Sequence, residues 1–171
     1  MPLNIEIKAS CADFALILSR LNKSLGVERV ELNQEDVFFA VPRGRLKMRC
    51  DEAFNGSEMI YYRRDFLDGL MISRYFRQPV FDAENKRLEL EQMYGVKGVV
   101  RKHRIAFISG DIRVHLDDVE GLGQYIEIEI LVSEETEIND AMFLARRMMK
   151  VFNIKNTDLI VDAYEDLLER T

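Results

Sequence analysis

The most constraining feature of this sequence is a two-residue alternation between charged and aliphatic side chains. It recurs in the segments 4–8, 45–49, 100–104, 113–117 and 125–130. Because successive side chains of a β-strand point to opposite faces, each segment presents its charged residues on one side and its aliphatic residues on the other. The alternation therefore predicts β-strands whose two faces differ sharply in polarity.

The charges on these strands are also sorted by sign. Arg45, Lys47 and Arg49 place three positive charges on one strand, and Glu127 and Glu129 place two carboxylates on another. Like charges at this spacing repel one another unless a counter-ion lies among them. Any one such strand is also typical of an antiparallel sheet with one face in water. As a set, they favour a sheet curled around a mostly basic cavity, which suits a polyphosphate bridged by a divalent metal.

Composition limits the class of protein. The chain has 171 residues, of which 47% are hydrophobic, and we expect residues 1–171 to form a single domain. Its net charge of −6 argues against general binding of nucleic acid, so a basic patch must be local. Cys11 and Cys50 are too few for a disulfide framework, and no apolar run reaches transmembrane length. Without a signal-peptide pattern, we expect a cytoplasmic protein with no membrane partner.

Hydrophobic spacing and turn residues predict the order of strands and helices. The expected strands cover residues 3–9, 27–33, 36–41, 45–49, 58–64, 72–77, 98–108, 111–116 and 124–132. The expected helices cover residues 12–25, 83–94, 134–152 and 158–170. Ser10 is the expected N-cap of the first helix and Gly26 its end. About eight strands with few helices indicate an antiparallel barrel.

Seven short motifs resemble, in kind and order, those of the CYTH superfamily, the triphosphate tunnel metalloenzymes. The opening Asn4–Lys8 is similar to the ExExK signature of that family. The other motifs are Gly44–Arg49, Tyr62–Arg64, Ser73–Tyr75, Val100–Arg104, Leu116–Gly123 and Glu127–Glu129. With Tyr164–Leu168, which resembles the family's usual ending, the similarity spans residues 4 to 168 and looks closest to the class IV adenylyl cyclase-like branch.

The resemblance implies an α+β fold: a closed eight-stranded antiparallel barrel with flanking helices, whose lumen holds a triphosphate and Mg²⁺ or Mn²⁺. Carboxylates suit such a metal, and the implied metal set is Glu6, Asp117, Glu127 and Glu129, with Asp117 either a ligand or an orienting residue. The implied phosphate-binding set is Lys8, Arg45, Lys47, Arg49, Arg64, Lys102, Arg104 and Arg113. The implied catalytic residues are Lys8, Glu6 and Glu129.

Some positions depart from this pattern or stay open. Asn4 replaces the first glutamate of the signature, which removes a negative charge and puts a tightly held second metal in doubt. Met71 stands where many members carry a basic residue. Arg45 begins its strand and can also point to solvent. His115 lies on the charged face, either as a titrating group or as a polar neighbour.

These features predict a metal-dependent enzyme that acts on a triphosphate. The favoured reaction is hydrolysis of the terminal phosphoryl group of inorganic tripolyphosphate or of a small organic triphosphate. One alternative is a class IV-type adenylyl cyclase, in which the ribose 3′-hydroxyl attacks the α-phosphate. Another is a non-catalytic triphosphate-binding module, which Asn4 favours. The expected partner is a small-molecule triphosphate, bound by a monomer or a homodimer.

Overall fold

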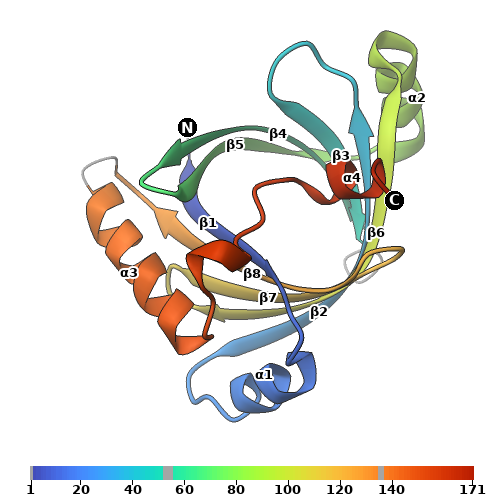
Figure 1. The fold of residues 1–171 in the computed structure, drawn as a ribbon. Coiled ribbons are helices and arrows are strands. Elements are labelled where there is room, and N and C mark those ends of the chain that lie inside the picture. The colour runs from blue at the N-terminus through green and yellow to red at the C-terminus, as the bar shows by residue number, and fades with distance from the viewer. Residues whose placement is uncertain (1, 52–55, 135–136) are drawn as a thin grey trace.

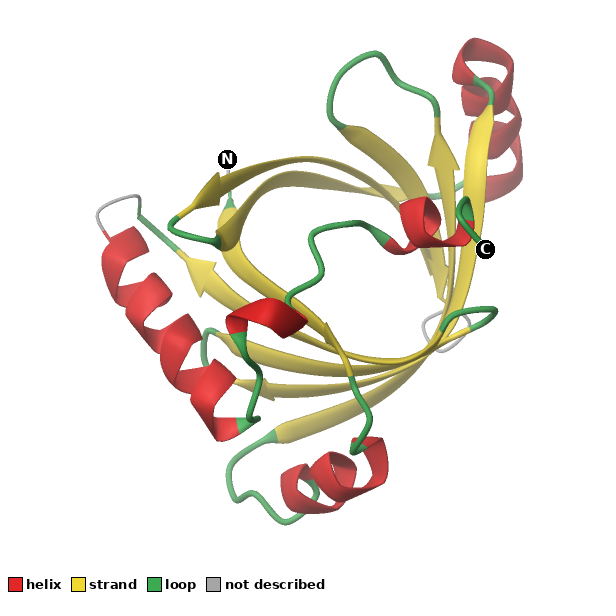
Figure 2. Ribbon diagram, in the orientation of Figure 1, coloured by secondary structure: helices red, strands yellow, loops and turns green. Residues whose placement is uncertain are grey.

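A computed structural model describes residues 2–51, 56–134 and 137–171, and its strands form a closed antiparallel barrel (Figures 1 and 2). The strands are β1 (Leu3–Ser10), β2 (Glu28–Phe39), β3 (Arg45–Asp51), β4 (Gly56–Leu67), β5 (Leu70–Val80), β6 (Val96–Ser109), β7 (Ile112–Val119) and β8 (Gly123–Val132). Their order around the barrel is β1-β5-β4-β3-β2-β6-β7-β8, and β8 pairs with β1. The predicted eight-stranded α+β barrel is confirmed.

The charged faces of the strands point into the barrel. On β1, Asn4, Glu6 and Lys8 are directed inward and are each at most 5% exposed. Ile5 and Ile7 have the opposite parity and belong to a hydrophobic core that lies outside the barrel wall. The alternation in the sequence therefore separates a polar lumen from an external apolar core.

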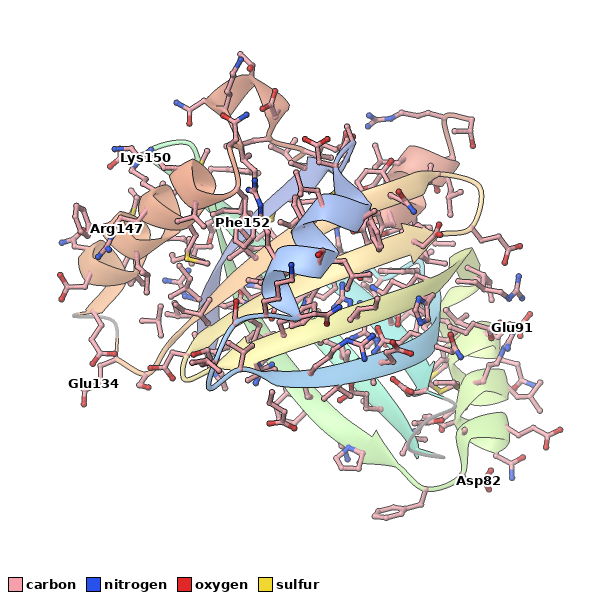
Figure 3. All side chains as sticks on the ribbon, turned by 90° about the horizontal axis from the view of Figure 1, so that it is seen from below. Asp82, Glu91, Glu134, Arg147, Lys150 and Phe152 are labelled. Carbon is pink, nitrogen blue, oxygen red and sulfur yellow. The ribbon has the colours of Figure 1, made fainter. Side chains whose placement is uncertain are left out.

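Two helices cover this external core. Helix α3 (Ile138–Val151) packs on β1 and β8 through Ala141, Met142, Ala145 and Met149. Helix α1 (Phe14–Leu21) adds its apolar face beside it. Figure 3 shows Arg147 and Lys150 on the side of α3 that faces away from the strands. No helix within the described ranges is long and apolar enough to cross a membrane.

The bounds of strand β2 and of helix α1 differ from those predicted. Strand β2 is continuous where two strands were expected, because it lies between β3 and β6 and residues 33–36 stay paired with β6. Helix α1 begins after Asp13, not Ser10, since Ser10 is still paired with Tyr125 in the barrel. It ends at Leu21, and Gly26 instead adopts a positive φ of 71° in the turn before β2.

The other predicted helices match in part. Helix α2 (Ala83–Tyr94) has the predicted bounds and ends at Gly95. Helix α3 begins at Ile138, later than the predicted start at residue 134, and residues 135 and 136 lie outside the described part of the chain.

The predicted helix over residues 158–170 is correct only over residues 164–168. The chain forms a short 3₁₀ helix, η2 (Asn156–Asp158), an extended link, and then α4 (Tyr164–Leu168). The link runs extended because β5 pairs with β1 only as far as Glu6, which leaves the next residues of β1 an open edge. Leu159 bridges to Ala9, and the Ile160 amide donates to the Lys8 carbonyl. Figure 1 shows this orange-to-red segment passing across the opening of the barrel.

Candidate functional site

The lumen is a polar cavity of about 100 Å³, several times the space that one water needs. Its basic lining residues are Lys8, Lys47, Arg49, Arg64, Arg77, Lys102, Arg104 and Arg113. Its carboxylates are Glu6, Asp36, Glu127 and Glu129. Basic side chains therefore outnumber carboxylates by eight to four, inside a chain whose net charge is −6. Positive charge is concentrated in the lumen.

Three carboxylates gather where β1 meets β8. The register places Glu6 opposite Glu129 and Lys8 opposite Glu127. Glu6 and Glu127 share a hydrogen bond, and the Glu6 carboxylate accepts another from Arg64 Nη2 at 2.6 Å. Burial, opposed by Arg64 but reinforced by the charge of Glu127, raises the pKa of Glu6 to about 7. Carboxylates crowded in this way fit a divalent cation, which would replace the shared proton.

His115 of β7 lies beside this carboxylate cluster. Its Nδ1 is 4.0 Å from Glu129 Oε1, and ligand atoms of His115, Glu127 and Glu129 all lie within 4.8 Å of one another. Burial, with the nearby Arg104 charge, lowers the pKa of His115 to about 4, so the imidazole is neutral at pH 7. The sequence placed His115 on the inward face but did not include it among the metal ligands.

Asp117 is fully buried behind the cavity wall rather than on its surface. It accepts hydrogen bonds from Arg104 Nε at 2.6 Å and from Arg104 Nη2 at 2.7 Å. The Tyr164 hydroxyl donates to the same carboxylate at 2.9 Å. With these contacts Asp117 fixes the guanidinium of Arg104, whose Nη2 also donates to Glu127. The orienting role left open for Asp117 by the sequence agrees with this geometry.

Asp36 of β2 is a lumen residue that sequence reasoning missed. Its carboxylate accepts from Arg49 Nε and Nη2 at 2.7 Å each and from Lys47 Nζ at 2.8 Å. Burial alone would raise its pKa, but Arg49, Lys47 and Lys102 hold it well below its usual value. The Asp36 carboxylate therefore supplies part of the negative charge that was expected among the basic residues of β3. Asp36 has the same two-residue spacing as Gln34 and Phe38 on β2, which is the pattern that would have identified it. The sequence predicts two strands that separate near this position, and this break conceals the pattern.

Arg45 does not line the cavity. Its guanidinium donates to Glu165 and to Asp166 of α4, so it joins the start of β3 to the C-terminal segment. Glu165 is buried, whereas Arg45 is 30% exposed. Of the residues in the predicted phosphate-binding set, Arg45 alone lies outside the lining of the lumen.

The C-terminal segment contributes Tyr164 to the cavity wall. Lys8 Nζ lies 4.5 Å and Lys102 Nζ 5.3 Å from the centre of its ring. Lys8 Nζ also donates to the Asp162 carbonyl at 3.1 Å, so the lysine of the opening motif is held by the end of the chain. Burial, with the Arg104 charge, lowers the pKa of Lys102 to about 7. Motif spacing gave no signal for these contacts, because their partners lie far apart in sequence.

Several buried hydrogen-bond donors of the lumen have no partner among the described residues. They are Nε and Nη1 of Arg64 and Nε of Arg113. Both side chains line the cavity. Unsatisfied guanidinium groups facing a polar cavity are suited to a multiply charged anion.

Known proteins resemble this chain in sequence and in fold. A model of the CYTH domain matches residues 2–164. A protein of Methanocaldococcus jannaschii named "Putative adenylate cyclase" is 26% identical over 174 residues, which cover 96% of this chain and 98% of that protein.

Solved structures share the fold. One is a protein of Vibrio parahaemolyticus described as a "putative adenylate cyclase", with a TM-score of 0.82, 21% identity and 98% of each chain covered. Another is a "Putative adenylyl cyclase" of Hippeastrum, described as having a dominant triphosphatase activity. It has a TM-score of 0.69 and 14% identity, and the alignment covers 99% of this chain and 96% of that one. Because the family model matches nearly the whole chain, this protein belongs to the CYTH family, the triphosphate tunnel proteins that its motifs resemble.

Proposed function

We propose that this protein is a metal-dependent triphosphatase that hydrolyses inorganic tripolyphosphate or a small organic or nucleoside triphosphate in its lumen. The observation that carries the proposal is the pairing of two features in one cavity. Arg64 and Arg113 present buried donors that have no partner among the described residues, and Glu6, Glu127 and Glu129 form a crowded carboxylate cluster. The first feature suits a polyphosphate and the second suits a divalent cation.

The basic lining residues would hold the phosphate chain. We assign this role to Lys8, Lys47, Arg49, Arg64, Lys102, Arg104 and Arg113. Asp117 holds the guanidinium of Arg104 in a fixed orientation. Little conformational entropy is therefore lost by Arg104 when an anion binds. Arg45 is assigned instead to anchoring α4, because Glu165 and Asp166 already bind its guanidinium.

Glu6, Glu127 and Glu129 would hold Mg²⁺ or Mn²⁺, which when bound neutralises phosphate charge and polarises water. In the reaction, a water oxygen bonds to the terminal phosphorus and the bridging oxygen leaves with the remaining phosphates. Lys8, fixed by the Asp162 carbonyl and the Tyr164 ring, lies 3.9 Å from Glu6 Oε1. It is placed to stabilise charge on the phosphate oxygens next to the carboxylates.

A class IV-type adenylyl cyclase is the second candidate. Part of the lumen lining is apolar or aromatic and suits a nucleobase or another organic group: Phe38, Ile60, Tyr62, Tyr75 and Val100. The names of the M. jannaschii and V. parahaemolyticus proteins also favour this chemistry. The triphosphatase activity ascribed to the Hippeastrum protein favours hydrolysis, the first candidate. A non-catalytic triphosphate-binding module is the third candidate. We place each of these functions in the cytoplasm, because Cys11 and Cys50 are free thiols.

The test is to incubate the purified protein with tripolyphosphate or ATP and either Mg²⁺ or Mn²⁺. We expect release of orthophosphate from the wild type and none from Glu129→Gln, with unchanged folding by circular dichroism. Glu137→Gln, which alters an exposed glutamate outside the barrel, is the control. Cyclic AMP with pyrophosphate would establish the cyclase instead. Binding measured by calorimetry without any product would establish the binding module.

A further inference from the structure

His115 is a buried side chain that the proposed phosphate chemistry leaves unused. The residue is 6% exposed, and its Nδ1 makes no hydrogen bond with any described residue. A buried imidazole nitrogen normally has a hydrogen-bond partner, because burying a polar atom without one destabilises the folded protein. The nearest acidic atom is Glu129 Oε1 at 4.0 Å, which is too far for a hydrogen bond. This separation leaves room for an atom that contacts both groups.

Glu129 differs from the other two carboxylates of the cluster. Arg64 binds Glu6 and Arg104 binds Glu127, whereas Glu129 has no lysine or arginine within ion-pair distance in the described part of the chain. Its side chain is 19% exposed and lines the cavity, so it is open to an ion that enters the lumen. Among the described residues, a carboxylate without a lysine or arginine partner therefore lies beside an imidazole whose Nδ1 makes no hydrogen bond.

We propose that His115 is a nitrogen ligand of a divalent metal held with Glu129 and Glu127, and that this site selects Mn²⁺ or Co²⁺ over Mg²⁺. Ligand atoms of the three residues lie within 4.8 Å of one another, a span that one ion bridges after small side-chain movements. Affinity for a site with a nitrogen ligand rises along the first transition series from Mn²⁺ to Co²⁺, whereas Mg²⁺ prefers oxygen ligands throughout. The neighbouring charge of Arg104 does not oppose the ion fully, because Asp117 and Glu127 neutralise it.

This inference deepens the proposed function, on which it rests for the presence of a metal. Its direct test is pulsed electron paramagnetic resonance of the full chain loaded with one equivalent of Mn²⁺. Nitrogen coupled to the ion gives a modulation that oxygen ligands do not give. We expect this modulation in the wild type and in His103→Gln, and its loss in His115→Gln. His103 is the matched control, because its side chain is 43% exposed on the outer face of β6.

A second measurement needs no substitution. The chain has two histidines, so labelling histidine with ¹⁵N in the wild type must shift the modulation from the ¹⁴N to the ¹⁵N frequency. Mn²⁺ that binds without nitrogen modulation, or with modulation that persists in His115→Gln, would overturn the proposal. This result is separate from the enzymatic test: nitrogen coupling without phosphate release refutes only the triphosphatase, and phosphate release without nitrogen coupling refutes only the His115 ligand.

Metal selectivity gives an independent readout. In calorimetric titrations, the ratio of Co²⁺ to Mg²⁺ affinity should fall about tenfold or more in His115→Gln, since loss of a metal-supporting group costs about 10–100-fold in affinity. The ratio should stay unchanged in His103→Gln. An equal loss of affinity for both ions in His115→Gln would mean that the histidine only supports the fold of the site, and the proposal would fail.

Discussion

At the scale of single residues, carboxylates bind the basic side chains of the lumen, and a bound triphosphate would compete with them for these side chains. Asp36 is the clearest case, because it binds Arg49 and Lys47 at once and is 2% exposed. Removing one member of a buried ion pair leaves the other uncompensated, which costs about 3–5 kcal/mol. The same removal also frees two cations for an incoming anion.

We therefore predict that Asp36→Asn is less stable than the wild type by about 3 kcal/mol at pH 7. Tripolyphosphate should raise its melting temperature by more than that of the wild type, because the anion replaces the missing charge. Differential scanning fluorimetry with and without tripolyphosphate measures both effects. The control is Asp65→Asn, which removes an exposed pair with Arg74 and should change little. A smaller ligand-induced shift in Asp36→Asn than in the wild type would contradict this account.

The lowered pKa of Lys102 leads to a second prediction at this scale. Its pKa in the folded protein is about 7, below the value of 10.5 expected for an unfolded chain. The folded state thus binds fewer protons than the unfolded state between these values, so this group adds stability as the pH rises from 7 to 10.5. At pH 8 the amine of Lys102 is therefore largely neutral when no anion is bound. A bound polyanion favours the charged amine and raises its pKa again.

Binding of tripolyphosphate at pH 8 should therefore take up protons. Calorimetry in buffers of different ionisation enthalpy measures this uptake. We expect the uptake to be lost in Lys102→Met and kept in Lys97→Met, which alters an amine that pairs with Asp166. The same proton uptake in Lys102→Met as in the wild type would assign it to another group.

At the scale of elements, the C-terminal segment contacts three strands of the barrel. Its link fills the open edge of β1, Tyr164 enters the wall of the lumen, and α4 receives Arg45. Glu165 is almost fully buried there, and it accepts from Arg45 on one oxygen. These contacts join the last residues of the chain to β1, β3 and β7.

From this arrangement we predict that Arg45→Met loosens α4 but weakens tripolyphosphate binding by less than Arg49→Met does. Hydrogen exchange of residues 163–168 should become faster in Arg45→Met, and calorimetry should show a near-normal affinity. In Arg49→Met the affinity should fall by about tenfold or more, since a charge-assisted hydrogen bond contributes about 1.5–3 kcal/mol. Equal losses of affinity in the two variants would return Arg45 to the phosphate-binding set.

The sequence allowed the barrel and most lumen residues to be predicted because a strand keeps its two-residue period along its whole length. This rule placed Glu6, Lys47 and Glu129 correctly on the inner face. It gave no information on partners, which depend on strands far apart in sequence. The pairing of Arg45 with Glu165 spans 120 positions, and no local spacing contains it. The same limit explains the wrong bounds of the predicted C-terminal helix, whose extended link is stabilised by the open edge of β1 rather than by its own residues.

At the scale of the whole molecule, the lumen is positively charged although the net charge of the chain is negative. The chain carries −6, while the lumen lining has four more basic than acidic side chains. The remainder of the chain is therefore strongly acidic, and it does not attract polyanions to its outer surface. In the described part of the chain, basic residues of several strands come together inside the barrel, so we expect a polyanion to be stabilised there.

The last prediction follows from this distribution. A ligand that binds only the folded state stabilises it by an amount that grows with concentration, about 2.7 kcal/mol at one hundred times its dissociation constant. Arg64 of β4, Arg49 of β3 and Arg104 of β6 all line the lumen. We expect tripolyphosphate to contact all three together and orthophosphate to contact only part of this set. At equal ionic strength, tripolyphosphate should therefore raise the melting temperature well above the shift produced by orthophosphate. Adding NaCl to the same ionic strength controls for screening at the surface. Equal shifts from all three salts would mean that the anions act at the acidic exterior and that the lumen does not bind a phosphate chain.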